Sequence, residues 1–317
     1  MQMLQLILIV CMASPLSLFG CIANVINMIV ISRMNLRQAV NITLLALAVS
    51  DFLGLLGTFW TTICFYPAVL ESEDIPFIPS EIKKMTGEWM HITFASITAH
   101  LTFIISAERC LCIIFPMKVK SLITIGRIKA IIIATFLFGI AVKVVRFYSI
   151  RFVWKFSANR NKTFLGVTRL ENWAEIEYPS RIISNVMSQY FTFFGVVILT
   201  IILVIKLKQQ ARWRQKTSKT AVSETSTKRD LKVTKTVCVI SAIFIICFLP
   251  EAINLSVYQL YDFGKAYPDI FTLVYTLTFL GENTNSAINI FVYLTFSTEY
   301  TKEFKRVFSF CKPPSPI

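Results

Sequence analysis

Seven long apolar stretches, separated by short polar segments, constrain this chain more than any other feature of its sequence. A helix that crosses the roughly 30 Å hydrocarbon core of a bilayer needs about 20 apolar residues. Only 16% of the 317 residues are charged, against about 25% in a soluble domain. We therefore expect an all-α membrane protein, a single seven-transmembrane helix bundle over residues 1–317. The expected helices span residues 4–31, 41–66, 86–113, 127–149, 182–207, 233–259 and 269–295.

A short amphipathic segment follows the last stretch, at 297–310. Tyr300, Phe304 and Phe308 recur there at intervals of four, with basic residues between them. One apolar and one basic face are typical of a helix that lies on the membrane surface. Cys311, which follows it, is a candidate for palmitoylation, and an unmodified cytoplasmic thiol is an equal alternative.

Basic residues are frequent in the short loops on one side of the expected bundle, while the longer loop at 150–181 on the other side is also basic, against the usual rule. The linker at 206–235 carries ten lysines and arginines, and Arg33 and Arg37 follow the first helix. Short basic loops stay in the cytoplasm, so we expect a multi-pass plasma-membrane protein with its amino terminus outside and its carboxyl terminus in the cytoplasm. Asn161 begins an Asn-Lys-Thr glycosylation acceptor in the 150–181 loop, which fits an outside location. Because the net charge of +14 falls in such loops, we expect the lipid bilayer and no nucleic acid as a partner.

The beginning of the chain is also apolar. The first 32 residues carry no charge, and this run is longer than the apolar region of a signal peptide. We interpret it as the first spanning helix. Almost no residues precede this helix, which would result either from a minimal amino terminus or from a truncated sequence.

Polar side chains inside the apolar stretches are the strongest indication of function. A charge at a helix centre costs about 2.5–3.5 kcal/mol on insertion scales, so each one needs a compensating role. At 100° per residue, Thr98 and Thr102 share a face with His91 and Arg109, whereas His100 points away. A second stripe follows one face of the last helix, formed by Glu282, Asn285, Ser286, Asn289 and Tyr293. The stripes predict a bundle with a polar axis, and hydrogen bonding between helices alone is the simpler alternative.

Five motifs, in order along the chain, resemble those of the rhodopsin-like (class A) G protein-coupled receptors. They are Asn24, "LALAVSD" ending at Asp51, "ERC" at residues 108–110, "CFLP" at 247–250 and "NSAINIFVY" at 285–293. Phrases such as "NITLLALAVSD" are more narrowly similar to invertebrate chemosensory receptors, especially those of molluscs. The resemblance implies a receptor that binds an extracellular small molecule and activates a heterotrimeric G protein. A neuropeptide receptor is the alternative, and a seven-helix ligand-gated ion channel, whose amino terminus would lie inside, is a remote one.

The resemblance also implies roles for individual residues. Arg109 would contact the G protein, and Glu108 and Asp230 would hold it in the resting state. The expected switch residues of the sixth and seventh helices are Phe248, Pro250, Asn289 and Tyr293. The expected sodium ligands are Asp51, Thr98, Asn285, Ser286 and Asn289. The expected ligand-binding residues are His91, Phe248, Glu251, Tyr275, Glu282 and Asn283.

The sequence leaves the role of two glutamates open and argues against a cofactor and against enzyme activity. Glu251 and Glu282 either receive a cationic group or pair with His91. No cofactor is expected beyond an allosteric sodium ion, and retinal is not, because residues 269–295 contain no lysine. The chain has no metal-ligand spacing, nucleophile elbow or phosphate loop, so we do not expect an enzyme.

One departure from the family concerns the outer loops. The family's disulfide joins the start of the third helix to the second outer loop. Lys84 stands at the first position, and residues 150–181 contain no cysteine. We therefore expect that loop to be held less firmly.

Overall fold

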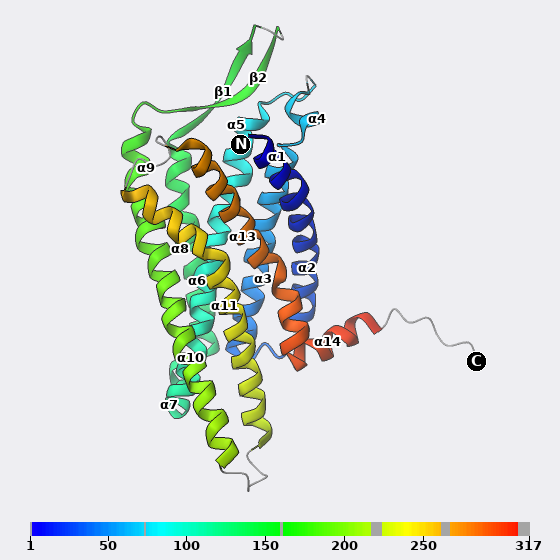
Figure 1. Ribbon diagram of the computed structural model, residues 1–317, viewed down its shortest axis with the longest axis vertical. Coiled ribbons are helices and arrows are strands. Elements are labelled where there is room, and N and C mark those ends of the chain that lie inside the picture. Colours follow the sequence, from blue (N-terminus) through cyan, green and yellow to red (C-terminus); the bar gives the residue numbers. More distant parts are fainter. Residues whose placement is uncertain (1, 73, 159–160, 217–223, 261–266, 310–317) are drawn as a thin grey trace, which may run out of the picture.

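The computed structural model describes residues 2–72, 74–158, 161–216, 224–260 and 267–309. Long helices run side by side over the apolar stretches (Figure 1). They are α2 (Ser14–Arg33), α3 (Ala39–Ile63), α6 (Trp89–Ile114), α8 (Ile125–Tyr148), α10 (Tyr190–Lys216), α11 (Glu224–Leu260) and α13 (Pro268–Phe296). Among the described residues, six helical segments are long and apolar enough to cross a membrane, and α13 is not one of them. The chain is therefore a mostly helical, multi-pass membrane protein.

Shorter helical pieces precede or follow the long ones. They are α1 (Gln2–Ile7), η1 (Leu8–Ala13), α4 (Pro67–Leu70), α5 (Pro79–Lys83), η2 (Lys84–Glu88), α7 (Pro116–Leu122), α9 (Trp173–Arg181) and η3 (Ile182–Gln189). Proline is the first residue of four described helices, at Pro67, Pro79, Pro116 and Pro268. Proline suits that position because its missing N–H has no partner within the helix there.

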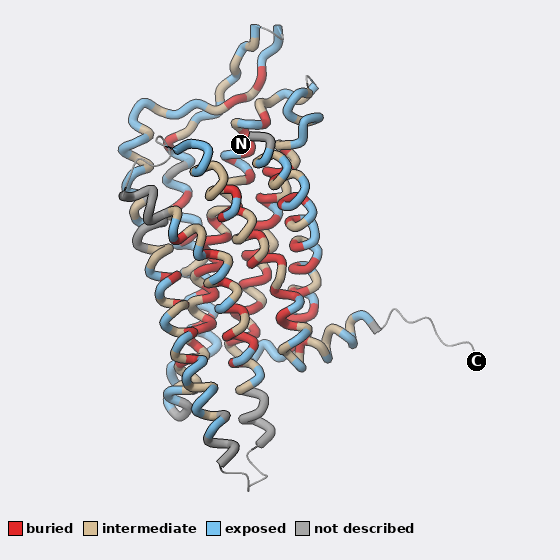
Figure 2. The backbone as a smooth tube through the Cα atoms, viewed as in Figure 1, coloured by how far each residue is buried: buried red, intermediate tan, exposed pale blue. Residues whose placement is uncertain are grey.

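The burial pattern is that of a bundle surrounded by lipid. Large apolar side chains such as Ile246 and Leu137 lie on the outside, 71% and 64% exposed. Asp51, Asn24 and Asn283 are instead buried to 1% exposure or less. Figure 2 shows the buried residues along the inner faces of the helices. The polar residues therefore face one another rather than the surroundings, which the cost of a charge in hydrocarbon requires.

The expectation of an all-α fold is wrong for the 150–181 loop, which contains a β-hairpin. β1 (Ile150–Ser157) and β2 (Lys162–Arg169) pair antiparallel, and the hairpin rises from one end of the bundle (Figure 1). β1 carries an aromatic residue at every second position from Phe152 to Phe156, an alternation that favours a strand. Asn161 has a φ of 46°, a left-handed conformation that asparagine tolerates better than most residues.

The hairpin is held midway along its strands by hydrogen bonds and an ion pair. The segment before α5 adds to the edge of β2: the Ile78 N–H donates to the Leu165 carbonyl, and the Leu165 N–H donates to the Pro76 carbonyl, both at 2.9 Å. Lys155 Nζ lies 2.8 Å from both carboxylate oxygens of Glu81. None of the seven cysteines that the structure describes forms a disulfide. The loop that was expected to be loosely held is thus anchored by backbone and ionic contacts.

Helix α14 (Thr298–Ser309) leaves the bundle at the end opposite the hairpin (Figure 1). The Ser297 hydroxyl accepts a hydrogen bond from the Tyr300 N–H at 3.3 Å, as an N-cap serine does. Tyr300 is 1% exposed, and its ring centroid lies 5.3 Å from that of Tyr293. The first turn of α14 is therefore packed into the bundle. We call the two ends of the molecule the hairpin end and the α14 end.

Candidate functional site

Asp51 is the centre of a hydrogen-bonded cluster between three helices. Its Oδ1 accepts hydrogen bonds from Thr98 on α6 at 2.7 Å and from Ser286 on α13 at 2.9 Å. Its Oδ2 accepts one from Asn289 Nδ2 at 2.8 Å. Three of the four residues expected beside Asp51 therefore contact it. Asn285 is buried on the same helix but makes no described hydrogen bond to Asp51.

Close helix packing makes this cluster possible. A Cβ added at Gly20 would lie 2.9 Å from the Cβ of Ala287, so only glycine lets α2 and α13 approach so closely. One turn further along α2, Asn24 Nδ2 donates to the Ser286 carbonyl at 2.9 Å. The asparagine thereby bonds to a carbonyl on the helix that carries two of the Asp51 partners.

A second polar cluster lies nearer the hairpin end. His91 Nε2 is 2.9 Å from Glu282 Oε2, and His91 Nδ1 is 3.0 Å from the Thr58 hydroxyl. The imidazole also lies edge-on to Phe279, with centroids 4.7 Å apart. The side chains of His91 and Glu282 are 5% and 11% exposed. Of the two readings left open by the sequence, the structure favours pairing of Glu282 with His91.

Glu251 lies in the same electrostatic environment. The Asn254 side chain is hydrogen-bonded to its carboxylate, and the charges of Glu282 and Lys143 act on it. Lys143 is buried on α8, at 5% exposure. Sequence reasoning overlooked Lys143, although a lysine inside an apolar stretch is the same signal that identified Asp51.

The remaining residues expected to bind ligand lie on α13 and α11. Tyr275 is half-buried and lies within electrostatic range of Glu282 and Glu251. Asn283 is fully buried; its Nδ2 donates to the Phe279 carbonyl at 2.6 Å, while its Oδ1 has no described hydrogen-bond partner. An unsatisfied buried acceptor is costly, so this oxygen is available to a donor from a water or a ligand.

Glu108 and Arg109 form an ion pair at the α14 end of α6. Arg109 Nη2 lies 2.5 Å from Glu108 Oε1, and the two side chains are 11% and 3% exposed. Glu108 Oε2 and Arg109 Nε have no described partner, so the pair leaves donor and acceptor capacity unused. The side chain of Asp230 lies outside the described residues.

The expected switch residues occupy packed positions on α11 and α13. Phe248 is buried and stacks on Phe244, with centroids 4.3 Å apart. Pro250 lies inside α11 two residues later. Tyr293 is buried to 1% exposure, and its hydroxyl has no described partner. Asn289 is the only one of the four that bonds directly to Asp51.

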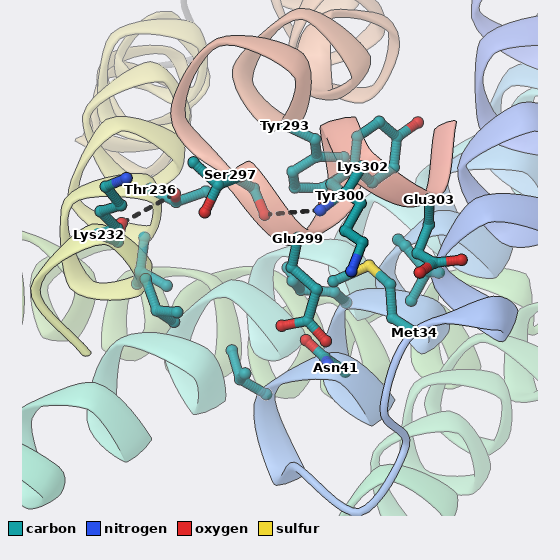
Figure 3. A pocket seen from close by; sticks show the side chains of 16 residues that line it. Met34, Asn41, Lys232, Thr236, Tyr293, Ser297, Glu299, Tyr300, Lys302 and Glu303 are labelled. Carbon is teal, nitrogen blue, oxygen red and sulfur yellow. Dashed lines mark hydrogen bonds between the residues drawn. The ribbon is translucent and has the colours of Figure 1, made fainter. Parts of the chain in front are cut away.

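A cavity of about 580 Å³ opens at the α14 end (Figure 3). Its apolar wall includes Ile31 and Leu44, and its polar wall includes Tyr293, Tyr300 and Lys232. Residues from α2, α3, α11, α13 and α14 therefore meet around one space. Its volume is within the range of about 300–1,000 Å³ that is usual for ligand sites.

The structure describes one of the two expected modification sites. Asn161 is exposed in the turn of the hairpin. Cys311 lies outside the described residues.

Comparison with known proteins places this chain in a protein family. Residues 12–311 match the family described as serpentine type 7TM GPCR chemoreceptor Srw. The chain is 25% identical over 301 residues to the FMRFamide receptor of Drosophila melanogaster, a match that covers 91% of this chain and 51% of that receptor. It is 27% identical over 223 residues to the adenosine receptor A2b of Homo sapiens, covering 65% of this chain and 63% of that receptor.

The chain thus spans about half the length of the first relative and under two thirds of the second. The family match, by contrast, covers nearly the whole chain. It confirms the resemblance that the five motifs indicated. This chain belongs to the serpentine-type seven-transmembrane G protein-coupled chemoreceptor family Srw.

Proposed function

We propose that the chain is a seven-helix plasma-membrane receptor that binds an extracellular ligand at the hairpin end and activates a heterotrimeric G protein at the α14 end. In this arrangement the amino terminus is outside, and α13 is the seventh spanning helix. The observation that supports this proposal most directly is that two buried side-chain pairs, His91–Glu282 and Glu108–Arg109, lie at opposite ends of one polar interior. Asp51 and its partners lie between them.

The ligand would bind between α6, α11 and α13. Glu282 is already paired with His91, so a cationic ligand would have to compete with an internal partner. Among the described residues, the Glu251 carboxylate and the Asn283 Oδ1, which has no described hydrogen-bond partner, are available to accept from ligand donors. We therefore propose a small ligand with at least one hydrogen-bond donor, sensed as a chemical signal.

A peptide ligand is the second candidate. The observation that favours it is the match to a relative named FMRFamide receptor, which covers most of this chain. The match to an adenosine receptor favours a small molecule. Both alternatives use the same G protein mechanism and differ only in what enters the hairpin end.

At the α14 end, Arg109 would be the residue that the G protein engages. Glu108 occupies it in the structure, and an arginine fork that is released can bind a carboxylate or backbone carbonyls bidentately. Asp230 would be a second resting-state partner. The cavity beside α14 supplies the space into which part of a G protein can enter (Figure 3).

The proposed receptor function also implies a sodium site and a lipidation site. Asp51, Thr98, Ser286 and Asn289 supply the hard oxygen ligands that suit a sodium ion, with Asn285 close by on α13. Cys311, which follows the last residue of α14 by two positions in the sequence, is the proposed lipidation site, and its acyl chain would fix α14 to the membrane surface.

The test is a ligand screen in cells that express the full chain beside a G protein dissociation sensor. The panel contains amino acids, biogenic amines, nucleosides and short amidated peptides. A response that Arg109→Ala abolishes at equal surface expression supports the proposal, and the active compound class separates small molecule from peptide. A response that persists in Arg109→Ala would refute it.

A further inference from the structure

The hydroxyl of Tyr300 is one end of a chain of hydrogen bonds that reaches the centre of the bundle. Tyr300, in the first turn of α14, donates to Asn27 Oδ1 on α2 at 2.7 Å. Asn27 Nδ2 in turn lies 3.2 Å from Asn24 Oδ1. All three side chains are 0–1% exposed. Asn24 and Asn27 are three residues apart, so they lie on the same face of α2.

The chain continues from α2 through α13 to Asp51. Asn24 Nδ2 donates to the Ser286 carbonyl at 2.9 Å, and the Ser286 hydroxyl donates to Asp51 Oδ1 at 2.9 Å. Every donor along this path points from α14 towards the carboxylate. The path is interrupted at Ser286, whose backbone carbonyl accepts one bond and whose hydroxyl donates the other, so its two halves are coupled through the position of this residue.

Packing alone does not require the Tyr300 hydroxyl. The ring already contacts Tyr293 and Phe304, at centroid distances of 5.3 and 6.2 Å, and a phenylalanine would keep both contacts. The hydroxyl is needed because Asn27 Oδ1 is buried and would otherwise lack this donor. Leaving a buried acceptor unsatisfied costs more than the hydrogen bond itself contributes.

Tyr300 also lines the cavity at the α14 end, with Tyr293 and Lys232 (Figure 3). The same side chain therefore contributes to the wall of that cavity and to the hydrogen-bonded path. A shift of α14 relative to α2 would break the path at its first link.

We propose that Tyr300 is a positioning residue that couples the placement of α14 to the hydrogen bonding of Asp51, through Asn27 and Asn24. The coupling concerns the folded chain itself and stands whether or not a G protein binds. Its functional meaning, that a change at Asp51 reaches the wall of the α14-end cavity, rests on the proposed function.

The first test compares the effect of Tyr300→Phe in two backgrounds of the purified full chain. In the wild-type background we expect the thermal midpoint to fall by about 3 °C or more, because Asn27 loses its donor. In the Asp51→Asn background we expect less than half of that fall, because the hydrogen bond that the Ser286 hydroxyl donates to residue 51 is weaker without the carboxylate charge and no longer fixes Ser286 in place. Equal falls in the two backgrounds would reduce Tyr300 to a local contact and overturn the proposal.

A matched control removes a hydroxyl that is not on the path. The Tyr190 hydroxyl on α10 lies 3.5 Å from the Ala252 carbonyl on α11. Tyr190→Phe should shift the midpoint by the same amount in the wild-type and Asp51→Asn backgrounds. A background-dependent shift for Tyr190→Phe as well would show a general effect of Asp51→Asn and would count against the path.

The second test needs no change at Asp51. Hydrogen–deuterium exchange of residues 298–309 is measured in the wild type, Tyr300→Phe and Asn24→Ala. The direct side-chain route from Asn24 to α14 runs through Asn27 and Tyr300, so a faster exchange of α14 in Asn24→Ala is the result that the proposal predicts. Unchanged exchange in Asn24→Ala, with faster exchange in Tyr300→Phe, would limit Tyr300 to holding α14 and would overturn the coupling.

Discussion

His91 on α6 and Glu282 on α13 are paired at 2.9 Å in the interior of the bundle, with both side chains at most 11% exposed. Removing one partner of a buried pair costs about 3–5 kcal/mol, because the other is left uncompensated. Replacing both with apolar residues of similar size costs much less. We therefore expect His91→Phe and Glu282→Leu each to lower the thermal midpoint of the purified chain more than the double variant does. Additive losses in the double variant would contradict the pairing.

The Glu81–Lys155 pair anchors the hairpin to the segment before α6. Glu81 Oε2 also accepts a hydrogen bond from the Val167 N–H at 2.6 Å, and Gly166 leaves room for the carboxylate. A half-exposed pair contributes about 0.2–1 kcal/mol, so the effect should be local. Glu81→Lys and Lys155→Glu should each speed amide exchange of residues 150–169, and the exchanged pair Glu81→Lys with Lys155→Glu should restore much of the protection.

The salt dependence of amide exchange in the hairpin tests the Glu81–Lys155 pair independently. Raising the ionic strength screens exposed charges, so the hairpin amides of the wild type should exchange faster in high salt. A Glu81→Gln variant has already lost the ion pair and should show a smaller salt effect. Equal salt effects in the two proteins would mean that the ion pair contributes nothing to holding the hairpin.

Sodium should stabilise the chain through Asp51. Replacing choline chloride with sodium chloride at equal ionic strength should raise the thermal midpoint of the wild type, because a ligand that binds only the folded state stabilises it. Asp51→Asn should abolish the increase, whereas Glu282→Gln, outside the cluster, should keep it. The same sodium response in Asp51→Asn as in the wild type would remove Asp51 from the site.

Orientation is tested by glycosylation at the hairpin turn. Asn161→Gln and Thr163→Ala should each increase electrophoretic mobility by the same amount as a glycosidase does. An acceptor placed in the linker at 206–235 should remain unmodified. Modification of the linker acceptor, with none at Asn161, would reverse the proposed orientation.

The sequence predicted the central cluster because its members are costly in an apolar stretch. Asp51 and Glu282 have no reason to lie inside spanning helices unless they meet polar partners, and they do so in the structure. The same reasoning would have found Lys143. Helical angles placed Asn285 beside Ser286 but could not give the rotation of α13 against α3, which decides that Ser286 contacts Asp51 and Asn285 does not.

The parts that could not be predicted depend on tertiary contacts between distant segments. The alternation of aromatic residues in β1 was present in the sequence, and the hairpin was missed because an all-helical fold was expected. The pairing of Glu81 with Lys155 joins residues 74 positions apart, and no local pattern indicates it. The bond from Tyr300 to Asn27 spans 273 positions, so the amphipathic spacing of α14 predicted its buried face but not the use of its hydroxyl.

The most direct test of the central claim, that Arg109 is the G protein contact and Glu108 restrains it, is basal nucleotide exchange by a G protein in membranes that hold the full chain. It needs no ligand and compares the wild type, Glu108→Gln and the double variant Glu108→Gln with Arg109→Ala at equal expression. We predict that Glu108→Gln raises the exchange rate and that the double variant returns it to the background of empty membranes. No increase in Glu108→Gln, or an increase that survives the loss of Arg109, would contradict the account.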